Sequence, residues 1–249
     1  MTNVRLIPRL DIKNDTVVKG IHLEGLRVVG KPAELALRYY EQGADEILYM
    51  DIVASLYQRN SLHEIVEKAS QNIFIPLIVG GGVRTLEDIR KLLRCGADKV
   101  AINTAAVKNP EFIKEGARAF GSQCIVGSIE AKRIGPGRWE AYTDNGRERT
   151  GLDVKEWVGR LLELGAGEIL VTSVDHEGTR KGFDLELIQT LAPMISVPFI
   201  VCGGAGKVDH FPEVLREGSI DAIAFSSVLH YGMLTISDIR RSLCPDPGH

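Results

Sequence analysis

Apolar and polar residues follow one pattern that occurs eight times along the chain. Each occurrence begins with a short run rich in Val, Ile, Leu and Ala, passes through a turn, and ends in a stretch whose apolar residues recur at i, i+3, i+4 and i+7. The short runs predict strands that are buried on both faces, and the longer spacing predicts amphipathic helices. The predicted strands are residues 4–12, 46–52, 75–80, 99–104, 124–131, 168–174, 198–202 and 221–228. The predicted helices include residues 32–42, 86–94, 154–164 and 208–216.

This alternation of buried strands and helices predicts the fold. Strands that are too apolar to face water form parallel sheets covered by helices. Eight strand–helix units in 249 residues have the size of a closed (β/α)8 barrel, or TIM barrel. We therefore expect one α/β barrel domain over residues 1–249, with its active site at the C-terminal ends of the strands.

The two halves of the chain repeat each other. Residues 43–48 read GADEIL, and residues 165–170 read GAGEIL. Residues 79–82 read VGGG, and residues 201–204, at the same separation, read VCGG. A period of this length is too long for a solenoid repeat and matches a half-barrel of four units. We therefore expect the ligand sites to be duplicated as well.

Glycine-rich turns follow the third and the seventh predicted strands. Glycine allows backbone N–H groups to approach an anion closely, and a phosphate site after strands 7 and 8 recurs in this fold. The alternative is that these glycines only form tight turns. The pattern favours two phosphate sites and hence a long substrate with a phosphate at each end. The residues of the two sites are Gly81, Gly82, Asn103 and Thr104 in the first half, and Gly203, Gly204, Ser226 and Ser227 in the second.

Acidic residues end several predicted strands. Asp11 and Glu130 occupy corresponding places in the two halves, so in a closed barrel they face each other across the mouth. Opposed carboxyl groups can divide general acid and general base catalysis between them. Asp51 and Asp175 also lie at strand ends, where a salt bridge or a helix cap explains them equally well. Lys19, in the predicted first loop, could close over an anionic substrate or simply be solvated.

Charged residues also stand where four apolar strands begin. Charges at such positions commonly mark a solvated rim. Two cations and two anions spaced around a barrel can instead pair about its axis and close its floor, and a floor that opens would be a gate. These residues are Arg5, Glu46, Lys99 and Glu168.

Composition narrows the possible partners. The formal net charge of −3 argues against a nucleic-acid surface, which needs clustered Lys and Arg. The N-terminal region has charges inside its first apolar run and no signal-peptide cleavage pattern, so we expect a cytoplasmic protein without a membrane partner. The cysteines lack metal-binding spacing, and we expect buried thiols, no metal and no cofactor. They are Cys95, Cys124, Cys202 and Cys244.

Taken together, these motifs resemble the cyclase subunit of imidazole glycerol phosphate synthase. The resemblance covers essentially the whole chain, and its many collinear motifs are specific for that family. The matching segments include LDIK at 10–13, VKG at 18–20, INTAAV at 102–107, FGSQ at 120–123 and GGAG at 203–206.

The resemblance implies a reaction and a partner. In that family a separate glutaminase makes ammonia, which passes through the barrel floor to a bisphosphorylated ribulosyl aminoimidazole carboxamide. The products are imidazole glycerol phosphate, for histidine biosynthesis, and an aminoimidazole carboxamide ribotide. By position, Asp11 and Glu130 would be the acid/base pair, and the four strand-start charges would be the ammonia gate. Substrate binding would add Lys19, Glu177 and Gly178, and Asp98 would contact a glutaminase docked on the N-terminal face as a heterodimer.

Five residues depart from the family pattern: Arg9 replaces a small residue, Glu130 and Glu177 replace aspartates, His176 replaces an arginine, and Cys202 replaces a serine. Glu130 reaches one methylene further than aspartate, and misplacing an acid can slow a reaction strongly. Arg9 could pair with Glu130 or bind an acidic substrate group.

We expect a cyclase, and these departures leave three alternatives open. One is a paralogue that delivers ammonia to nucleotide-sugar amidation. Another is the sister phosphoribosyl isomerase, which shares the phosphate sites but has no ammonia partner. The third is a non-catalytic scaffold that only conducts ammonia.

Overall fold

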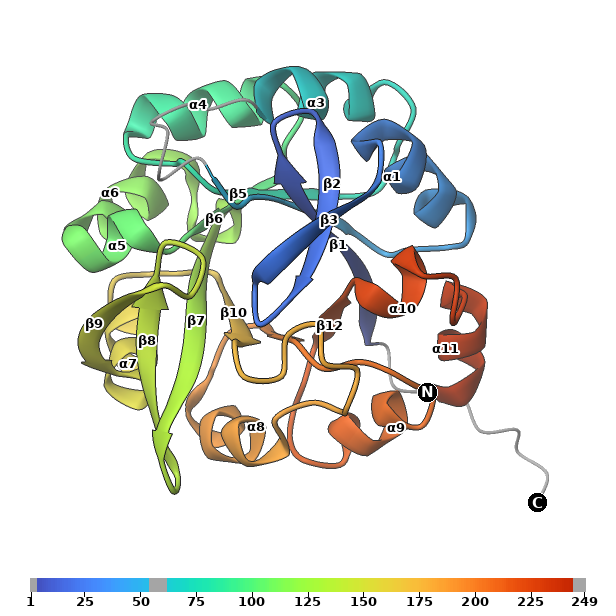
Figure 1. The fold of residues 1–249 in the computed structure, drawn as a ribbon. Coiled ribbons are helices and arrows are strands. Elements are labelled where there is room, and N and C mark those ends of the chain that lie inside the picture. The colour runs from blue at the N-terminus through green and yellow to red at the C-terminus, as the bar shows by residue number, and fades with distance from the viewer. Residues whose placement is uncertain (1–3, 54–61, 244–249) are drawn as a thin grey trace.

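The computed structural model describes residues 4–53 and 62–243, so Cys244 lies outside the described residues. Eight parallel strands form a closed barrel, since each strand pairs with the next and the last pairs with the first (Figure 1). The predicted (β/α)8 barrel is therefore confirmed. In order around the barrel, the strands are β1 (Arg5–Lys13), β4 (Ile47–Asp51), β5 (Leu77–Gly80), β6 (Lys99–Ile102), β7 (Ile125–Gly135), β10 (Glu168–Ser173), β11 (Phe199–Cys202) and β12 (Ala222–Phe225).

Helices surround this barrel on its outside (Figure 1). Local signals explain where two of them begin: Thr85 and Asp88 form a capping box at α4, and the Asp153 side chain accepts N–H groups at the start of α7. The predicted helix at 86–94 has the observed bounds, and the other three differ by one or two residues at an end. The helices are α1 (Pro32–Glu41), α3 (Leu62–Ser70), α4 (Leu86–Arg94), α5 (Thr104–Lys108), α6 (Glu111–Phe120), α7 (Val154–Glu163), α8 (Leu185–Leu191), α9 (His210–Leu215), α10 (Ser227–His230) and α11 (Ile236–Leu243), with short 3-10 turns η1 (Ser122–Cys124) and η2 (Ala192–Met194).

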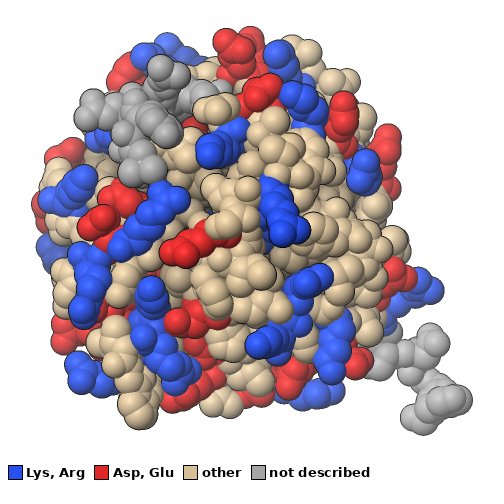
Figure 2. Space-filling view, viewed as in Figure 1, with Lys and Arg blue, Asp and Glu red and all other residues tan. Residues whose placement is uncertain are grey.

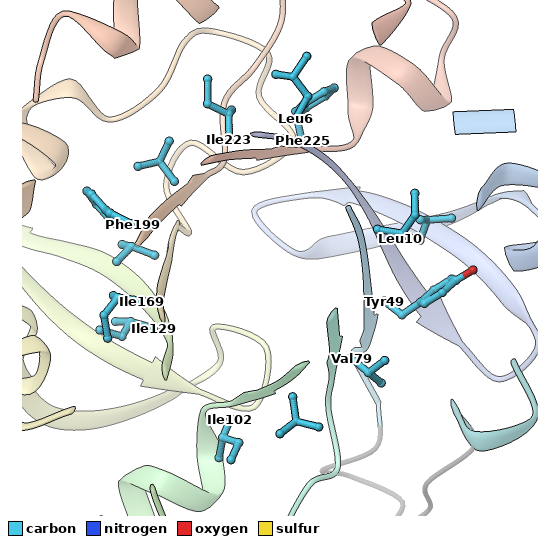
Figure 3. Packing of buried hydrophobic residues seen from close by; sticks show 14 of the residues in the cluster. Leu6, Leu10, Tyr49, Val79, Ile102, Ile129, Ile169, Phe199, Ile223 and Phe225 are labelled. Carbon is cyan, nitrogen blue, oxygen red and sulfur yellow. The ribbon is translucent and has the colours of Figure 1, made fainter. Parts of the chain in front are cut away.

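Apolar side chains pack on both sides of the barrel wall. Successive side chains of a strand point to opposite faces, so Leu6 and Leu10 of β1 pack outward against the helices while Ile7 points inward. Figure 3 shows the outward set around the barrel, including Tyr49 and Ile169. The inner cluster forms a layer across the barrel that contains larger side chains and several alanines. Its members are Ile7, Leu48, Ile78, Ala101, Val126, Leu170, Ile200, Cys202, Ala222 and Ala224.

Two antiparallel hairpins extend the barrel wall beyond the predicted strands. The strands β2 (Thr16–Ile21) and β3 (Glu24–Gly30) continue from β1 and lie across the barrel mouth (Figure 1). The strands β8 (Arg138–Thr143) and β9 (Glu148–Asp153) pair with the extended end of β7. The hairpins are absent from the predicted strand set because their sequences mix polar or charged residues with apolar ones, and β3 and β9 are largely exposed.

Two smaller observations complete the fold. The three described cysteines are free thiols, and Cys202 is buried in β11 as expected. Cys95 and Cys124 are only partly buried, so the expectation of buried thiols is wrong for these two, and Cys124 lies in η1 rather than in the predicted fifth strand. Burial raises the pKa of the Cys202 thiol to about 11, so it stays protonated at neutral pH. Among the described helices, none combines the length and the apolar character that crossing a lipid bilayer requires.

Candidate active site

The residues predicted for the first phosphate site line a cavity of about 120 Å³ at the barrel mouth. Gly81 and Gly82 have φ values of 94° and 72°, and a Cβ on Gly81 would lie 2.1 Å from the Asp51 carbonyl oxygen. Glycine is therefore required there by backbone geometry. Asn103 and Thr104 line the same cavity, as do the basic residues Arg84 and Lys108.

The residues predicted for the second phosphate site line a much smaller cavity, of about 10 Å³. Gly203 and Gly204 again have positive φ values, of 102° and 108°. This volume holds about one water molecule and is too small for a phosphate. The β2–β3 hairpin docks beside this cavity, because the His22 N–H donates to the Glu177 carbonyl oxygen at 2.8 Å. Its lining residues are Glu177, Gly178, Gly203, Gly204, Ala205, Phe225, Ser226 and Ser227.

Asp11 lies beneath this hairpin in a buried ionic network. Its Oδ1 accepts from Arg9 Nε at 2.7 Å, and its Oδ2 accepts from Lys19 Nζ at 3.3 Å. Lys19 also donates to Glu177, so two cations face two carboxylates. Burial alone raises the pKa of Asp11, but Arg9 and Lys19 outweigh it and hold the pKa below its usual value. Asp11 is thereby held as a carboxylate.

Two expectations about this network are wrong. Lys19 lies in β2 rather than in a solvated loop, and it is only 2% exposed. Arg9 pairs with Asp11 rather than with Glu130, because residues two apart on one strand share a face. The other end of Arg9 reaches across the barrel, where Nη1 donates to Thr172 Oγ1 at 2.9 Å. The i, i+2 spacing of Arg9 and Asp11 was the signal in the sequence that could have identified the pair.

Glu130 lies in a different environment, on the wall of the larger cavity. Its Oε2 accepts the Gly146 N–H at 2.7 Å. Burial raises the pKa of Glu130 to about 7, which the Gly146 hydrogen bond and Arg9 offset only in part. A carboxyl group with this pKa can both give and accept a proton at neutral pH.

The residues that end other strands take structural contacts. The Asp51 side chain accepts the Val53 N–H at 3.0 Å, and Asp175 accepts the Arg133 N–H at 2.7 Å. Asn145, to which none of the sequence motifs pointed, lines the larger cavity beside Glu130. It belongs to an Asp-Asn-Gly turn between β8 and β9, and this tripeptide is itself a recognisable hairpin signal.

The four strand-start charges meet at the opposite end of the barrel. Arg5 Nη1 lies 2.5 Å from Glu46 and 3.1 Å from Glu168, and Lys99 Nζ lies 3.1 Å and 2.8 Å from the same two carboxylates. Each cation therefore contacts both anions, and the four side chains form a closed ring. Glu46 and Glu168 are only 4% and 6% exposed, so the alternative of a solvated rim is wrong.

Asp98 is exposed beside this ring, and its Oδ2 accepts the Leu77 N–H at 2.8 Å. Asp45 and Asp221 make the equivalent contacts, to Leu6 and Phe199. The carboxylate of Asp98 thus has a structural partner within the chain, and contact with another subunit stays a prediction.

Comparison with known proteins agrees with this geometry. The histidine biosynthesis protein family matches residues 5–235. A Legionella pneumophila protein named imidazole glycerol phosphate synthase subunit HisF is 63% identical over 211 residues, which cover 85% of this chain and all of the relative. A protein of the same name from Bacillus cereus (strain Q1) is 48% identical over 239 residues, which cover 96% of this chain and 95% of the relative. The match extends over nearly the whole barrel, and the chain belongs to the histidine biosynthesis protein family.

Proposed function

We propose that this protein is the cyclase subunit of an imidazole glycerol phosphate synthase. It would use ammonia to convert the bisphosphorylated ribulosyl aminoimidazole carboxamide into imidazole glycerol phosphate and the aminoimidazole carboxamide ribotide, a lyase reaction of histidine biosynthesis. The observation that carries the proposal is the closed ionic ring at the barrel floor, opposite the two glycine-rich pockets. A sister isomerase would have no ammonia to admit and no use for such a ring.

The two pockets supply the binding end of the proposal. Each phosphate of the substrate would lie against one glycine-rich loop, where backbone N–H groups can approach it closely. Arg84 and Lys108 line the larger pocket, and basic side chains are spread among acidic ones over the mouth face (Figure 2). These charges favour the approach of an anionic substrate. The second pocket, of about 10 Å³, would have to enlarge to accept its phosphate.

The carboxyl groups supply the chemistry. Glu130 faces the larger cavity and can exchange a proton there, so it is the acid/base group of the proposal. Asp11, held by two cations, would act as a fixed negative charge that stabilises positive charge developing on the substrate. The family's two catalytic positions would thus have unequal roles in this chain.

Ammonia would come from a glutaminase docked on the N-terminal face in a cytoplasmic heterodimer. Both relatives are named as subunits of a synthase, which implies a partner subunit for them. The ring of Arg5, Glu46, Lys99 and Glu168 lies at that face and would open to admit ammonia. Exposed Asp98, next to Lys99, would contact the glutaminase.

A second candidate is ammonia delivery to nucleotide-sugar amidation by a paralogue of the cyclase. The buried ion pair between Arg9 and Asp11 favours it, because the pair lowers the pKa of Asp11 and makes it a weaker base. The pair also reduces the space at the centre of the mouth, since Arg9 reaches Thr172.

Turnover of the ribulosyl bisphosphate with an ammonium salt, measured on the isolated chain, tests the choice. Release of the aminoimidazole carboxamide ribotide is the result expected for the cyclase. Binding of the substrate by calorimetry without any turnover would reject the cyclase and favour amidation. Absence of both binding and turnover would reject the substrate class altogether.

A further inference from the structure

The turn at residues 144–146 joins β8 to β9 and forms one wall of the larger cavity. Asn145 is 8% exposed, and its Oδ1 has no hydrogen-bond donor within reach among the residues that the structure describes. A buried acceptor without a partner is costly and rare in native proteins. Here the acceptor belongs to a side chain that lines the cavity, so a molecule bound against this side chain can supply the missing donor.

The orientation of this amide follows from its surroundings. Asn145 Nδ2 lies 3.4 Å from the Leu23 carbonyl oxygen of the β2–β3 turn, to which it donates. Rotating the amide by half a turn would place two oxygens against each other, so Oδ1 is the atom left without a partner. Asp144 and Asn145 both have left-handed backbone conformations, with φ of 52° and 61°, which hold the side chain in place.

The turn at residues 144–146 contacts Glu130 and Thr104, two residues that line the cavity. The Gly146 N–H donates to Glu130 Oε2 at 2.7 Å, on the side of the proposed acid/base group. The Asp144 N–H donates to Thr104 Oγ1 at 3.4 Å, on the side of the first phosphate loop. Asn145 stands between these two contacts in the chain. Because Thr104, Glu130 and Asn145 line the same cavity, a ligand that fills this cavity lies against Asn145.

We propose that Asn145 determines ligand specificity by accepting a hydrogen bond from an N–H or O–H group of a phosphorylated ligand. The phosphate of that ligand lies at the Gly81–Gly82 loop, and its donor lies between the loop and Glu130. This inference rests on the proposed function for the identity of the ligand, whose donor is either a sugar hydroxyl or the carboxamide. It adds a residue that recognises the part of the substrate next to the phosphate.

The substitution Asn145→Gly removes the acceptor and tolerates the left-handed backbone. Asn14→Gly is the matched control, because Asn14 is also left-handed, with φ of 57°, but is exposed at the turn before β2. Calorimetry would use three probes: inorganic phosphate, ribose 5-phosphate and the aminoimidazole carboxamide ribotide. We expect Asn145→Gly to weaken a donor-bearing probe by about tenfold and to leave inorganic phosphate within about twofold.

The pattern of losses identifies the donor. Weakening of the ribotide alone assigns the carboxamide, and weakening of ribose 5-phosphate as well assigns a sugar hydroxyl. Asn145→Asp keeps an acceptor oxygen but loses the donation to Leu23, so it should bind the donor-bearing probe better than Asn145→Gly does. If both variants lose the same affinity, the side chain acts only by holding the hairpin and the proposal is wrong.

Three other results would overturn the inference. They are unchanged binding of all probes by Asn145→Gly, an equal loss for inorganic phosphate, and a wild type that binds no probe more tightly than inorganic phosphate. None of these depends on turnover. A failure here is thus distinguishable from failure of the cyclase proposal, which is decided by product release from the ribulosyl bisphosphate.

Discussion

Asp11 on β1 and Glu130 on β7 occupy equivalent places in the two halves of the barrel, yet their surroundings shift their pKa values in opposite directions. Asp11 lies in a closed network with Arg9 and Lys19, and its pKa is below the usual value because these cations outweigh burial. Glu130 borders a cavity of about 120 Å³, and burial raises its pKa to about 7. Repetition of sequence motifs therefore has not produced repetition of chemistry.

The two pockets also differ from each other, and the closure of the barrel explains which carboxyl group lies near each pocket. β7 belongs to the second half of the chain but pairs with β6 of the first, so Glu130 serves the pocket of Asn103 and Thr104. β1 pairs with β12 in turn, and the Asp11 network lies toward the pocket of Glu177. Each half thus contributes a carboxyl group to the neighbourhood of the other half's pocket. The hairpin that carries Lys19 docks on Glu177, which lines the smaller pocket.

The largest loss of turnover is expected from replacing Glu130, the proposed acid/base group. Glu130→Gln removes the group that can exchange a proton in the open cavity, and we expect turnover with ammonium to fall by about 100-fold or more. Substrate binding, measured by calorimetry, should change little because the phosphate loops supply most of it. Glu130→Asp is the matched variant, and it should keep activity because it keeps the carboxyl group. Turnover of Glu130→Gln within tenfold of the wild type would contradict the role of Glu130.

Removing the ion pair between Arg9 and Asp11 should have the next largest effect, on the free energy of unfolding. Arg9→Met removes one partner of a buried ion pair, and we expect the free energy of unfolding in urea to fall by about 3 kcal/mol. Arg241→Met is the control, since Arg241 pairs with Asp238 at the surface with its side chain 78% exposed, and its loss should cost below about 1 kcal/mol. Equal losses for the two variants would show that burial of the Asp11 network contributes nothing particular to stability.

The floor ring tests the other end of the barrel. Lys99→Ala opens one quarter of the ring, and we expect glutamine-dependent turnover in the complex with the glutaminase to fall by about tenfold, as for the loss of a charged hydrogen bond. Turnover with ammonium should change little, because ammonium can enter from the mouth. Lys114→Ala, at an exposed pair with Glu111, is the control and should change neither rate. A similar drop in both rates for Lys99→Ala would reduce the ring to a structural role.

The smallest expected effect concerns stability: the contributions of the two carboxyl groups to the free energy of unfolding should depend on pH in opposite directions. Glu130 has a folded pKa of about 7 against an ordinary value of 4.5, so the fold binds its proton more tightly than the unfolded chain does. Its contribution to stability is present below pH 4.5 and is lost as the pH rises toward 7. Asp11 has the opposite sign, because its pKa is lowered, and its contribution is lost as the pH falls below its ordinary value of 3.8.

Urea unfolding as a function of pH measures this difference. Glu130→Gln should abolish the loss of stability between about pH 5 and pH 7, and it should leave the acid limb in place. If the variant and the wild type follow the same curve between these values, Glu130 titrates at its ordinary pKa and the contrast with Asp11 disappears.

The sequence alone determined the barrel and the grouping of the residues predicted for each phosphate site, since each group lines one cavity. Strand and helix periodicity are local properties, and parallel strands bring all their C-terminal ends to one edge, so motifs at strand ends must meet. The pairing within the floor ring was also within reach, because four opposite charges at strand starts have few other partners in a closed barrel.

Only the tertiary structure decided the partners of Arg9 and Lys19, the unequal pockets and the position of Asn145. Arg9 meets Thr172 and Lys19 meets Glu177 across more than half the chain, and no local pattern specifies such contacts. The pKa values of Asp11 and Glu130 depend on these neighbours and on burial rather than on the residue types themselves. Local periodicity thus determines the strand or helix position of a residue. Packing between distant segments determines the pKa of its side chain and the ligand that it can contact.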